Sequence, residues 1–190
     1  MSAIPVIETP RLRLRPHRPE DAAAHAAMWA DPAVVRFIGG EPLTREAAWS
    51  RLLRQPGLWQ WLGFGFLVIE DRATGAFLGE AGFHDLKRDI APSIEGTLEA
   101  GWVLARAAQG RGVAEEAMRA MLAWADAARP GQRITCIIRP AHGASLRVAA
   151  KLGFAPFAQA IYSGAPIMLL ERAGTGQAAP AKAEAGGAAD

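Results

Sequence analysis

The feature that most constrains how this chain folds is a short loop with two glycines, placed between a strand pattern and a helix pattern. Its residues are Gln109-Gly110-Arg111-Gly112-Val113-Ala114. Before the loop, residues 97–104 alternate like a strand, and after it apolar residues recur at helical spacing until Pro130-Gly131. A strand that passes through a tight turn into an amphipathic helix is typical of α/β proteins, in which helices pack on a sheet.

The loop has the composition of an anion-binding turn. Its glycines let the backbone approach an anion closely, and the first amides of the following helix, with the positive end of its dipole, can bind phosphate oxygens. Arg111 can add a charge-assisted hydrogen bond. The loop lacks the Lys-Ser/Thr ending of a nucleotide P-loop and the glycine spacing of a dinucleotide fingerprint. On the local pattern alone, a glycine-rich turn that caps a surface helix is an equal alternative.

The rest of the chain alternates between strand and helix patterns. We expect further strands at residues 7–15, 64–70, 76–84, 134–138 and 167–171. The second and third of these form a hairpin around the turn 71–75. We expect further helices at residues 20–30, from Thr44 to a stop at Pro56-Gly57, and at 142–152. Residues 85–95 are a polar loop.

Length and composition predict one domain followed by a tail. A chain of 190 residues is a natural size for a single domain with its own core. Beyond Arg172 the sequence consists mostly of Ala, Gly, Pro, Lys and Glu, which cannot bury enough apolar surface to become ordered. We therefore expect a domain over residues 1–172 and a disordered tail over residues 173–190.

The charge of the chain argues against nucleic acid as a partner. The formal net charge is only +2, so no strong electrostatic field would attract a polyanion. The densest basic cluster is Arg11, Arg13, Arg15 and Arg18. Leucines alternate with these arginines, and the alternation predicts an exposed strand face.

The single cysteine, Cys136, excludes an intrachain disulfide and a metal site built from cysteines. It lies in an apolar run, so we expect a buried structural thiol and not a nucleophile. The histidines show no metal-ligand spacing, and no metal is expected. The chain has no secretory signal and no apolar stretch near the roughly 20 residues that cross a bilayer. We therefore expect a cytoplasmic protein without a membrane partner.

Four stretches, in the same order along the chain, together resemble one known family. The pattern Gln-x-x-Gly-x-Ala in the loop, after Gly101-Trp102-Val103-Leu104, is similar to the acetyl-CoA pyrophosphate loop of the GNAT N-acetyltransferase superfamily. Residues 8–15, 65–79 and 145–154 resemble the opening strand, the central hairpin and the C-terminal helix-to-strand signature of its RimJ/RimL-like branch, the ribosomal-protein N-terminal acetyltransferases. The resemblance covers residues 7–172.

The resemblance implies a GNAT-type α/β fold in a single domain. The sheet would be mixed, mostly antiparallel and twisted, with six or seven strands and helices on both faces. Strands 97–104 and 134–138 would splay apart, and the pantetheine arm of acetyl-CoA would pair there with backbone groups of Val103 and Leu104. The residues implied to bind the cofactor are Trp102, Val103, Leu104, Gln109, Gly110, Arg111, Gly112, Val113, Ala114, His142 and Ser145.

The resemblance also implies catalytic roles, with two departures from the family pattern. The backbone amide of Leu104 would stabilise the oxyanion that forms when an amine attacks the thioester. Many GNAT enzymes carry a tyrosine, which protonates the departing thiolate, where this chain has Ala149. In the RimJ/RimL-like branch a serine one turn earlier is the proposed substitute, and Ser145 occupies that position; equally, Ser145 could bind backbone amides at a helix start. His142 replaces the usual asparagine that contacts pantetheine, and it can still donate a hydrogen bond.

The general base is assigned to Glu99, because the attacking amine must lose a proton. Glu99 lies on the central strand, where the alternative is an ion-paired glutamate without a catalytic role. Glu80 and His84 on the preceding strand are rivals for the base. His17 and His25 show no partner pattern.

The tryptophans between the second helix and the hairpin have two interpretations. Trp59 and Trp61 could pack in the core, which is the usual place for such side chains. Alternatively, they could wall the acceptor pocket, because this segment borders the substrate cleft in similar enzymes. Exposed aromatic surface also leaves a homodimer open.

The function implied by the resemblance is acetyl transfer from acetyl-CoA to a primary amine, by direct attack in a ternary complex. The acceptor stays open between a protein N-terminus, an aminoglycoside-like polyamine and an amino-acid-like metabolite. A non-catalytic acyl-CoA-binding module is one alternative, because the tyrosine is absent. A ribosome-associated module is another, although the modest net charge opposes it.

Overall fold

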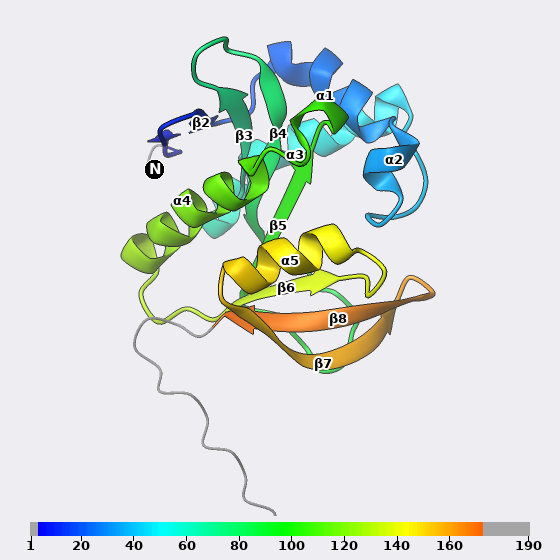
Figure 1. The fold of residues 1–190 in the computed structure, drawn as a ribbon. Helices are drawn as coiled ribbons and strands as arrows, with labels where there is room; N and C mark the ends of the chain where they lie inside the picture. Colours follow the sequence, from blue (N-terminus) through cyan, green and yellow to red (C-terminus); the bar gives the residue numbers. More distant parts are fainter. Residues whose placement is uncertain (1–3, 173–190) are drawn as a thin grey trace, which may run out of the picture.

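The computed structural model describes residues 4–172, which fold around one eight-stranded sheet (Figure 1). The predicted tail, residues 173–190, lies outside the described residues. Neighbouring strands follow the order β1-β2-β3-β4-β5-β6-β8-β7, and β5 and β6 are the parallel pair. The strands are β1 (Ile7–Glu8), β2 (Leu12–Arg15), β3 (Phe66–Asp71), β4 (Phe77–His84), β5 (Leu98–Leu104), β6 (Ile134–Ile138), β7 (Phe154–Tyr162) and β8 (Ala165–Arg172).

Five α-helices and two short 3₁₀ helices connect these strands within residues 4–172. They are η1 (Pro19–Asp21), α1 (Ala22–Trp29), α2 (Pro32–Val35), α3 (Arg45–Leu62), η2 (Arg106–Ala108), α4 (Val113–Ala128) and α5 (Gly143–Lys151). The helix predicted after the glycine loop is confirmed as α4. No helix in this part of the chain is both long and apolar enough to cross a bilayer.

Successive side chains of β4 contact helices on opposite faces of the sheet. Ala81 and Phe83 belong to the main apolar cluster, together with Met118 of α4. Glu80, which directly precedes Ala81, accepts a hydrogen bond at 3.2 Å from the indole of Trp29, which belongs to α1. Because side chains alternate along a strand, helices cover both faces of the sheet, as the sequence predicted.

The start of the chain differs from its prediction. Residues 7–15 form two short strands, β1 and β2, which pair with each other at Ile7↔Leu14 and Glu8↔Arg13. The Thr9 hydroxyl accepts a hydrogen bond from the Leu12 amide at 2.9 Å, and this contact closes the turn between them.

Arg15 is buried and is not part of an exposed strand face. Its guanidinium donates to both carboxylate oxygens of Asp21 at 2.8 Å and also pairs with Glu70. The sequence pattern correctly placed Leu12 and Leu14 in the core, but it could not show the two acidic partners that let an arginine be buried on the other face.

Helix α3 continues beyond its predicted end. It runs through Pro56 and ends at Gly63, whose backbone has φ of 71°. The last turn is retained because Trp59 is buried and its indole N–H donates to the Phe66 carbonyl at 3.0 Å. Tertiary contacts of this kind outweigh the loss of one helical hydrogen bond at the proline.

The sheet has eight strands and not the predicted six or seven, because residues 7–15 form two strands and because β7 was not predicted. This strand lies at the edge of the sheet, beside β8 (Figure 1). It contains Pro156, and the register with β8 shifts between Pro156 and Ala158. Proline and exposed apolar residues such as Ile161 are typical of an edge strand, and they hide the alternation by which a strand is predicted.

Candidate active site

The sheet opens between β5 and β6. The two strands pair only at Leu98↔Ile134 and Glu99↔Thr135, whereas the pairing of β5 with β4 continues to Leu104. One side of β5 from residue 100 onward therefore has no strand beside it. This is the splay that the family resemblance implied.

The alternation of backbone hydrogen bonds determines which groups face this gap. The amide of Ala105 donates to the Leu78 carbonyl at 2.9 Å, which places Leu104 in a non-hydrogen-bonded pair with Gly79 of β4. The amide of Leu104, and by alternation that of Trp102, consequently points away from β4 and toward the gap. The backbone of Val103 faces β4 instead, so it is not free to pair with a ligand in the gap as the resemblance implied, whereas the backbone of Trp102 is.

The glycine loop has the backbone geometry that its sequence predicted. Gly110 and Gly112 have φ of 73° and 76°, in the left-handed region that favours glycine. Gly112 is the N-cap of α4, and no side chain caps the helix. The first amides of α4 therefore have neither a helical partner nor a side-chain acceptor. Gln109 ties the loop to the end of β5 through a hydrogen bond from its side-chain amide to the Leu104 carbonyl at 3.1 Å.

The turn between β1 and β2 holds the glycine loop and the start of α4 through hydrogen bonds. Arg11 donates to the Arg111 carbonyl at 3.0 Å and to the Glu116 carboxylate at 2.6 Å. Thr9 donates to the same carboxylate at 2.6 Å. The Arg111 side chain is exposed, and within residues 4–172 its guanidinium makes one hydrogen bond, to the Ala107 carbonyl at 3.5 Å. Arg111 is thus held by its backbone, and its charge is left to interact with an anion.

A cavity of about 390 Å³ lies between the glycine loop and the start of α5. Eight residues that the sequence assigned to the cofactor line it: Trp102, Val103, Leu104, Gln109, Gly110, Ala114, His142 and Ser145. Among the other three, Arg111 and Gly112 lie exposed in the same loop, whereas Val113 is buried in the core. We call this space the loop cavity.

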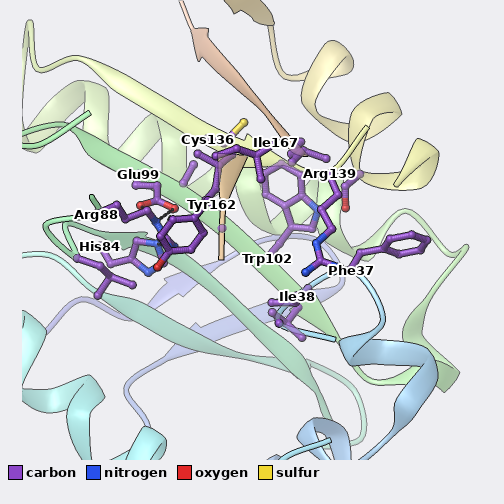
Figure 2. A pocket seen from close by; sticks show the side chains of 18 of the residues that line it. Phe37, Ile38, His84, Arg88, Glu99, Trp102, Cys136, Arg139, Tyr162 and Ile167 are labelled. Carbon is purple, nitrogen blue, oxygen red and sulfur yellow. Dashed lines mark hydrogen bonds and ion pairs between the residues drawn. The ribbon is translucent and has the colours of Figure 1, made fainter. Parts of the chain in front are cut away.

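A second cavity, of about 420 Å³, adjoins the loop cavity. The two share six lining residues: Phe37, Ile38, Trp102, Val103, His142 and Ser145. Figure 2 shows Glu99, Arg88, His84 and Tyr162 grouped at one end of this second cavity, and Trp102, Arg139 and Phe37 at the other. We call it the arginine cavity, after four arginines in its wall. A molecule in each cavity would meet the other at Trp102 and Ser145.

Ser145 and His142 stand at the start of α5, where the two cavities meet. The His142 ring stacks on Phe37 with centroids 4.5 Å apart, and burial lowers its pKa. The Ser145 hydroxyl makes no hydrogen bond to any residue between 4 and 172, so it does not cap the helix. Ala149, one turn further on, is fully buried and offers no acid.

Glu99 is buried in the wall of the arginine cavity and is ion-paired. Arg88 donates to its carboxylate at 2.7 Å, and the His84 ring lies 3.1 Å from it. Burial by itself raises the pKa of Glu99, but His84 and Arg88 outweigh burial and hold the pKa below its usual value. Glu99 is therefore ionised at neutral pH and is a weak proton acceptor. Its role as the base stays a prediction.

Glu80 has two histidine partners that the sequence analysis did not predict. Glu80 is fully buried, and its carboxylate lies 2.9 Å from the His17 ring and 3.3 Å from the His25 ring. Burial raises the pKa of Glu80, but hydrogen bonds from the two histidines outweigh this and lower it. The statement that His17 and His25 have no partner is thus wrong. The partners come from elements far apart in the chain, and no local spacing could have shown them.

Two other expectations concern bulky or reactive side chains. Cys136 is buried as expected, and burial raises the pKa of its thiol. Trp59 packs against Trp124 in the core, with ring centroids 5.3 Å apart, whereas Trp61 is 87% exposed. Neither Trp59 nor Trp61 lines the loop cavity or the arginine cavity, so these two cavities do not support the interpretation of the pair as an acceptor wall. Trp102 lines both cavities.

Comparison with known proteins identifies the family. The family model for the acetyltransferase (GNAT) domain matches residues 11–155. The chain belongs to the GNAT acetyltransferase family. As a GNAT protein with this fold, it is an acetyl-CoA-dependent N-acetyltransferase.

Relatives of this GNAT chain come from several bacteria. The uncharacterized protein YkkB of Bacillus subtilis is 31% identical over 159 residues, which cover 80% of this chain and 87% of YkkB. A structure from Bordetella pertussis described as a GNAT-family acetyltransferase is 36% identical, with a TM-score of 0.79 over 90% of this chain and 100% of that one. RimL, the ribosomal L7/L12 α-N-protein acetyltransferase, in complex with coenzyme A, has a TM-score of 0.72 at 17% identity, covering 88% of this chain and 97% of RimL. At that identity the likeness to RimL concerns the fold alone.

Proposed function

We propose that this enzyme transfers the acetyl group of acetyl-CoA directly to a primary amine while both are bound. The observation that carries the proposal is the pair of adjoining cavities, which share the wall formed by Trp102, Val103 and Ser145. Acetyl-CoA occupies the loop cavity, and the amine occupies the arginine cavity. Holding both reactants together supplies a large part of the rate gain, so no covalent enzyme intermediate is needed.

In this proposal the cofactor is held mostly by backbone groups. The diphosphate lies against the uncapped first amides of α4, where the helix dipole favours negative charge, and Arg111 adds a charged contact. The pantetheine arm follows the open side of β5 and pairs with the backbone of Trp102 and Leu104. His142, at the start of α5, supplies a hydrogen-bond donor beside the arm.

The reacting atoms then lie beside three groups with separate roles. The amine nitrogen attacks the thioester carbonyl, and the oxyanion that forms accepts a hydrogen bond from the Leu104 amide. When the carbon–sulfur bond breaks, the sulfur takes a proton from the Ser145 hydroxyl, and Ser145 regains a proton from solvent to replace it. Glu99 receives the proton that the amine loses.

The arginine cavity itself helps to keep the amine neutral. A like charge nearby disfavours the charged form of an ammonium group and lowers its pKa. Arg51, Arg54 and Arg139 line the cavity in which the amine would lie. Because the amine then binds with fewer protons to lose, Glu99 has less proton transfer to perform, which suits a carboxylate whose lowered pKa makes it a weak base.

The cofactor assignment is tested by two matched substitutions at Gly112. Asparagine tolerates the left-handed backbone of this position, and aspartate has the same shape with a negative charge. We expect G112N to bind CoA with an affinity within about threefold of the wild type. We expect G112D to bind at least about tenfold more weakly than G112N, because the aspartate places a carboxylate against the diphosphate. Isothermal titration with CoA measures both affinities. Equal affinities in two folded variants would show that the diphosphate lies elsewhere.

A further inference from the structure

The larger cavity has a strongly unbalanced charge. Its wall contains four arginines, Arg51, Arg54, Arg88 and Arg139, and a single carboxylate, Glu99. Arg88 is paired with that carboxylate at 2.7 Å. Three arginines therefore remain for whatever the cavity binds.

Two of these three have no acidic partner. No carboxylate in residues 4–172 lies within ion-pair distance of Arg54 or Arg139. Arg139 donates only to the Arg36 carbonyl, at 3.4 Å, and its side chain lies between Trp102 and Phe37 (Figure 2). The chain thus holds positive charge beside the reaction centre without using it for its own structure.

The third, Arg51, is partly buried and incompletely hydrogen-bonded. Its guanidinium lies 3.8 Å above the Trp29 ring, and its Nε is 3.8 Å from a Glu80 oxygen, too far for a hydrogen bond. That Nε is buried with no partner among the described residues. Glu80 is already engaged by two histidines, so it compensates Arg51 only at this distance.

The surroundings of Arg51 favour a bound anion. Burial lowers the pKa of Arg51, and although Glu80 raises it, the nearby charges of Arg54 and Arg88 lower it further. An anion in the cavity would offset that repulsion. Arg51 and Arg54 are three residues apart on α3, so they lie on the same side of the helix and can hold one anionic group together.

We propose that the acceptor is a primary amine that also carries a carboxylate, and that Arg51 and Arg54 hold this carboxylate with support from Arg139. The inference rests on the proposed function, since it places the acceptor in the arginine cavity. It selects among the acceptors that the sequence left open: an amino-acid-like metabolite or an acidic peptide N-terminus fits, whereas a polyamine would bring a second positive charge against three arginines.

The test compares three amines of equal chain length: γ-aminobutyrate, its uncharged amide, and putrescine. Each is assayed with acetyl-CoA by the release of free CoA. We expect kcat/KM for γ-aminobutyrate to exceed that for the amide at least about tenfold, as for one charge-assisted hydrogen bond, and putrescine to be the poorest of the three. Equal rates for acid and amide, or a preference for putrescine, would overturn the proposal.

Substitutions at Arg54 assign the preference to a residue. Arg54 is exposed, so R54Q should fold normally, and we expect it to lower the ratio of kcat/KM for γ-aminobutyrate to kcat/KM for the amide about tenfold. R54E should reverse the order and favour putrescine. R45Q is the matched control, because Arg45 is an exposed arginine on the same helix that lines neither cavity. An unchanged acid-to-amide ratio in R54Q would contradict the assignment.

Two further comparisons distinguish a failure of the carboxylate proposal from a failure of the proposed function on which it rests. If CoA does not bind, or no amine releases CoA, the proposed function fails; if CoA binds and uncharged amines react best, only the carboxylate proposal fails. The C-terminally amidated peptides Ser-Glu-Gly-NH2 and Ser-Gln-Gly-NH2, of which only the first carries a carboxylate, distinguish the source of the carboxylate. A tenfold preference for the acidic peptide that is lost in R54Q supports the same site with a protein N-terminus as its substrate, and a preference for the neutral peptide contradicts it.

Discussion

Glu80 is a strand glutamate that is fully buried, whereas most glutamates in proteins are exposed to solvent. Its carboxylate contacts His17, both His25 and Trp29 of α1, and Arg51 of α3. A buried carboxylate is tolerated only when its oxygens are satisfied, and here both are. Glu80 therefore fixes α1 and α3 on the sheet, and through Arg51 it also positions one wall of the cavity.

We predict that E80Q lowers the free energy of unfolding by about 3 kcal/mol, because removing one partner leaves the others buried without compensation. Because the pKa of Glu80 is lowered in the folded protein, its ionised form stabilises the fold above the unfolded pKa of about 4.3, and this contribution is lost as the pH falls toward the folded pKa. Urea denaturation at pH 7 and below pH 4 should show the difference from the wild type narrowing at the acid end. E41Q is the control, because Glu41 is exposed. If the difference in free energy of unfolding between E80Q and the wild type were the same at both pH values, it would contradict the stabilising role of ionised Glu80.

A second prediction at this scale concerns Ser145. If its hydroxyl protonates the departing thiolate, S145A should lower kcat about a hundredfold and leave the affinity for CoA within about threefold. S145T keeps a hydroxyl and should recover part of the rate. The control is S50A, on the exposed side of α3. A normal kcat in S145A would remove Ser145 from the mechanism.

At the scale of elements, α3 shows how tertiary contacts decide where a helix ends. Its last turn holds Trp59 in the core and brings Leu62 beside Arg129, which donates to the Leu62 carbonyl at 2.9 Å. Gly63 then ends the helix in the left-handed conformation. The same helix carries Arg51 and Arg54, so its length and fixed rotation matter for the site.

Two glycines of this helix should respond to alanine with opposite signs. Gly57 is inside the helix with open space around it, so G57A should stabilise the protein by about 1 kcal/mol. Gly63 has positive φ, and an added Cβ would lie 2.2 Å from a guanidinium nitrogen of Arg129, so G63A should destabilise it by about 1–2 kcal/mol. Thermal unfolding of the two variants beside the wild type measures both effects. Changes of the same sign would contradict this account of the helix end.

The elements also show what the sequence could predict. The loop at Gly110 and Gly112, and helix α4 after it, could be predicted because glycine geometry and helical periodicity are local properties. The extent of α3 beyond Pro56, the edge strand β7, and the contacts of Glu80 with its histidines depend on partners far along the chain. Eight of the eleven residues that the sequence assigned to the cofactor line the loop cavity, whereas the arginines of the arginine cavity were not predicted. A count of charges near the expected cleft would have been the one available signal for them.

For the molecule as a whole, the opening between β5 and β6 is the organising feature. The sheet is continuous on both sides of it, and helices cover both faces (Figure 1). One half ends in the β7–β8 hairpin that carries Tyr162, and the other half carries α3 and its arginines. A ligand in the opening contacts both halves, so binding should stabilise the entire domain.

We expect CoA at a hundredfold excess over its Kd to stabilise the protein by about 2.7 kcal/mol. For a domain of this size that corresponds to a rise in Tm of roughly 5–10 °C. Differential scanning calorimetry across a CoA titration measures the shift. G112D, with at least about tenfold weaker affinity, should show about half of this shift or less at the same CoA concentration, and an equal shift in that variant would contradict the assigned site.

The contacts of Arg11 with the Arg111 carbonyl and with Glu116 have a practical consequence for handling the protein. A shortened chain that begins after residue 11 would retain every side chain that lines either cavity, yet its cofactor loop would lose its outer support. The affinity for acetyl-CoA should therefore depend on whether Arg11 is present. Proteolytic trimming that removes Arg11 should lower the affinity for acetyl-CoA, although no residue between 4 and 11 lines either cavity.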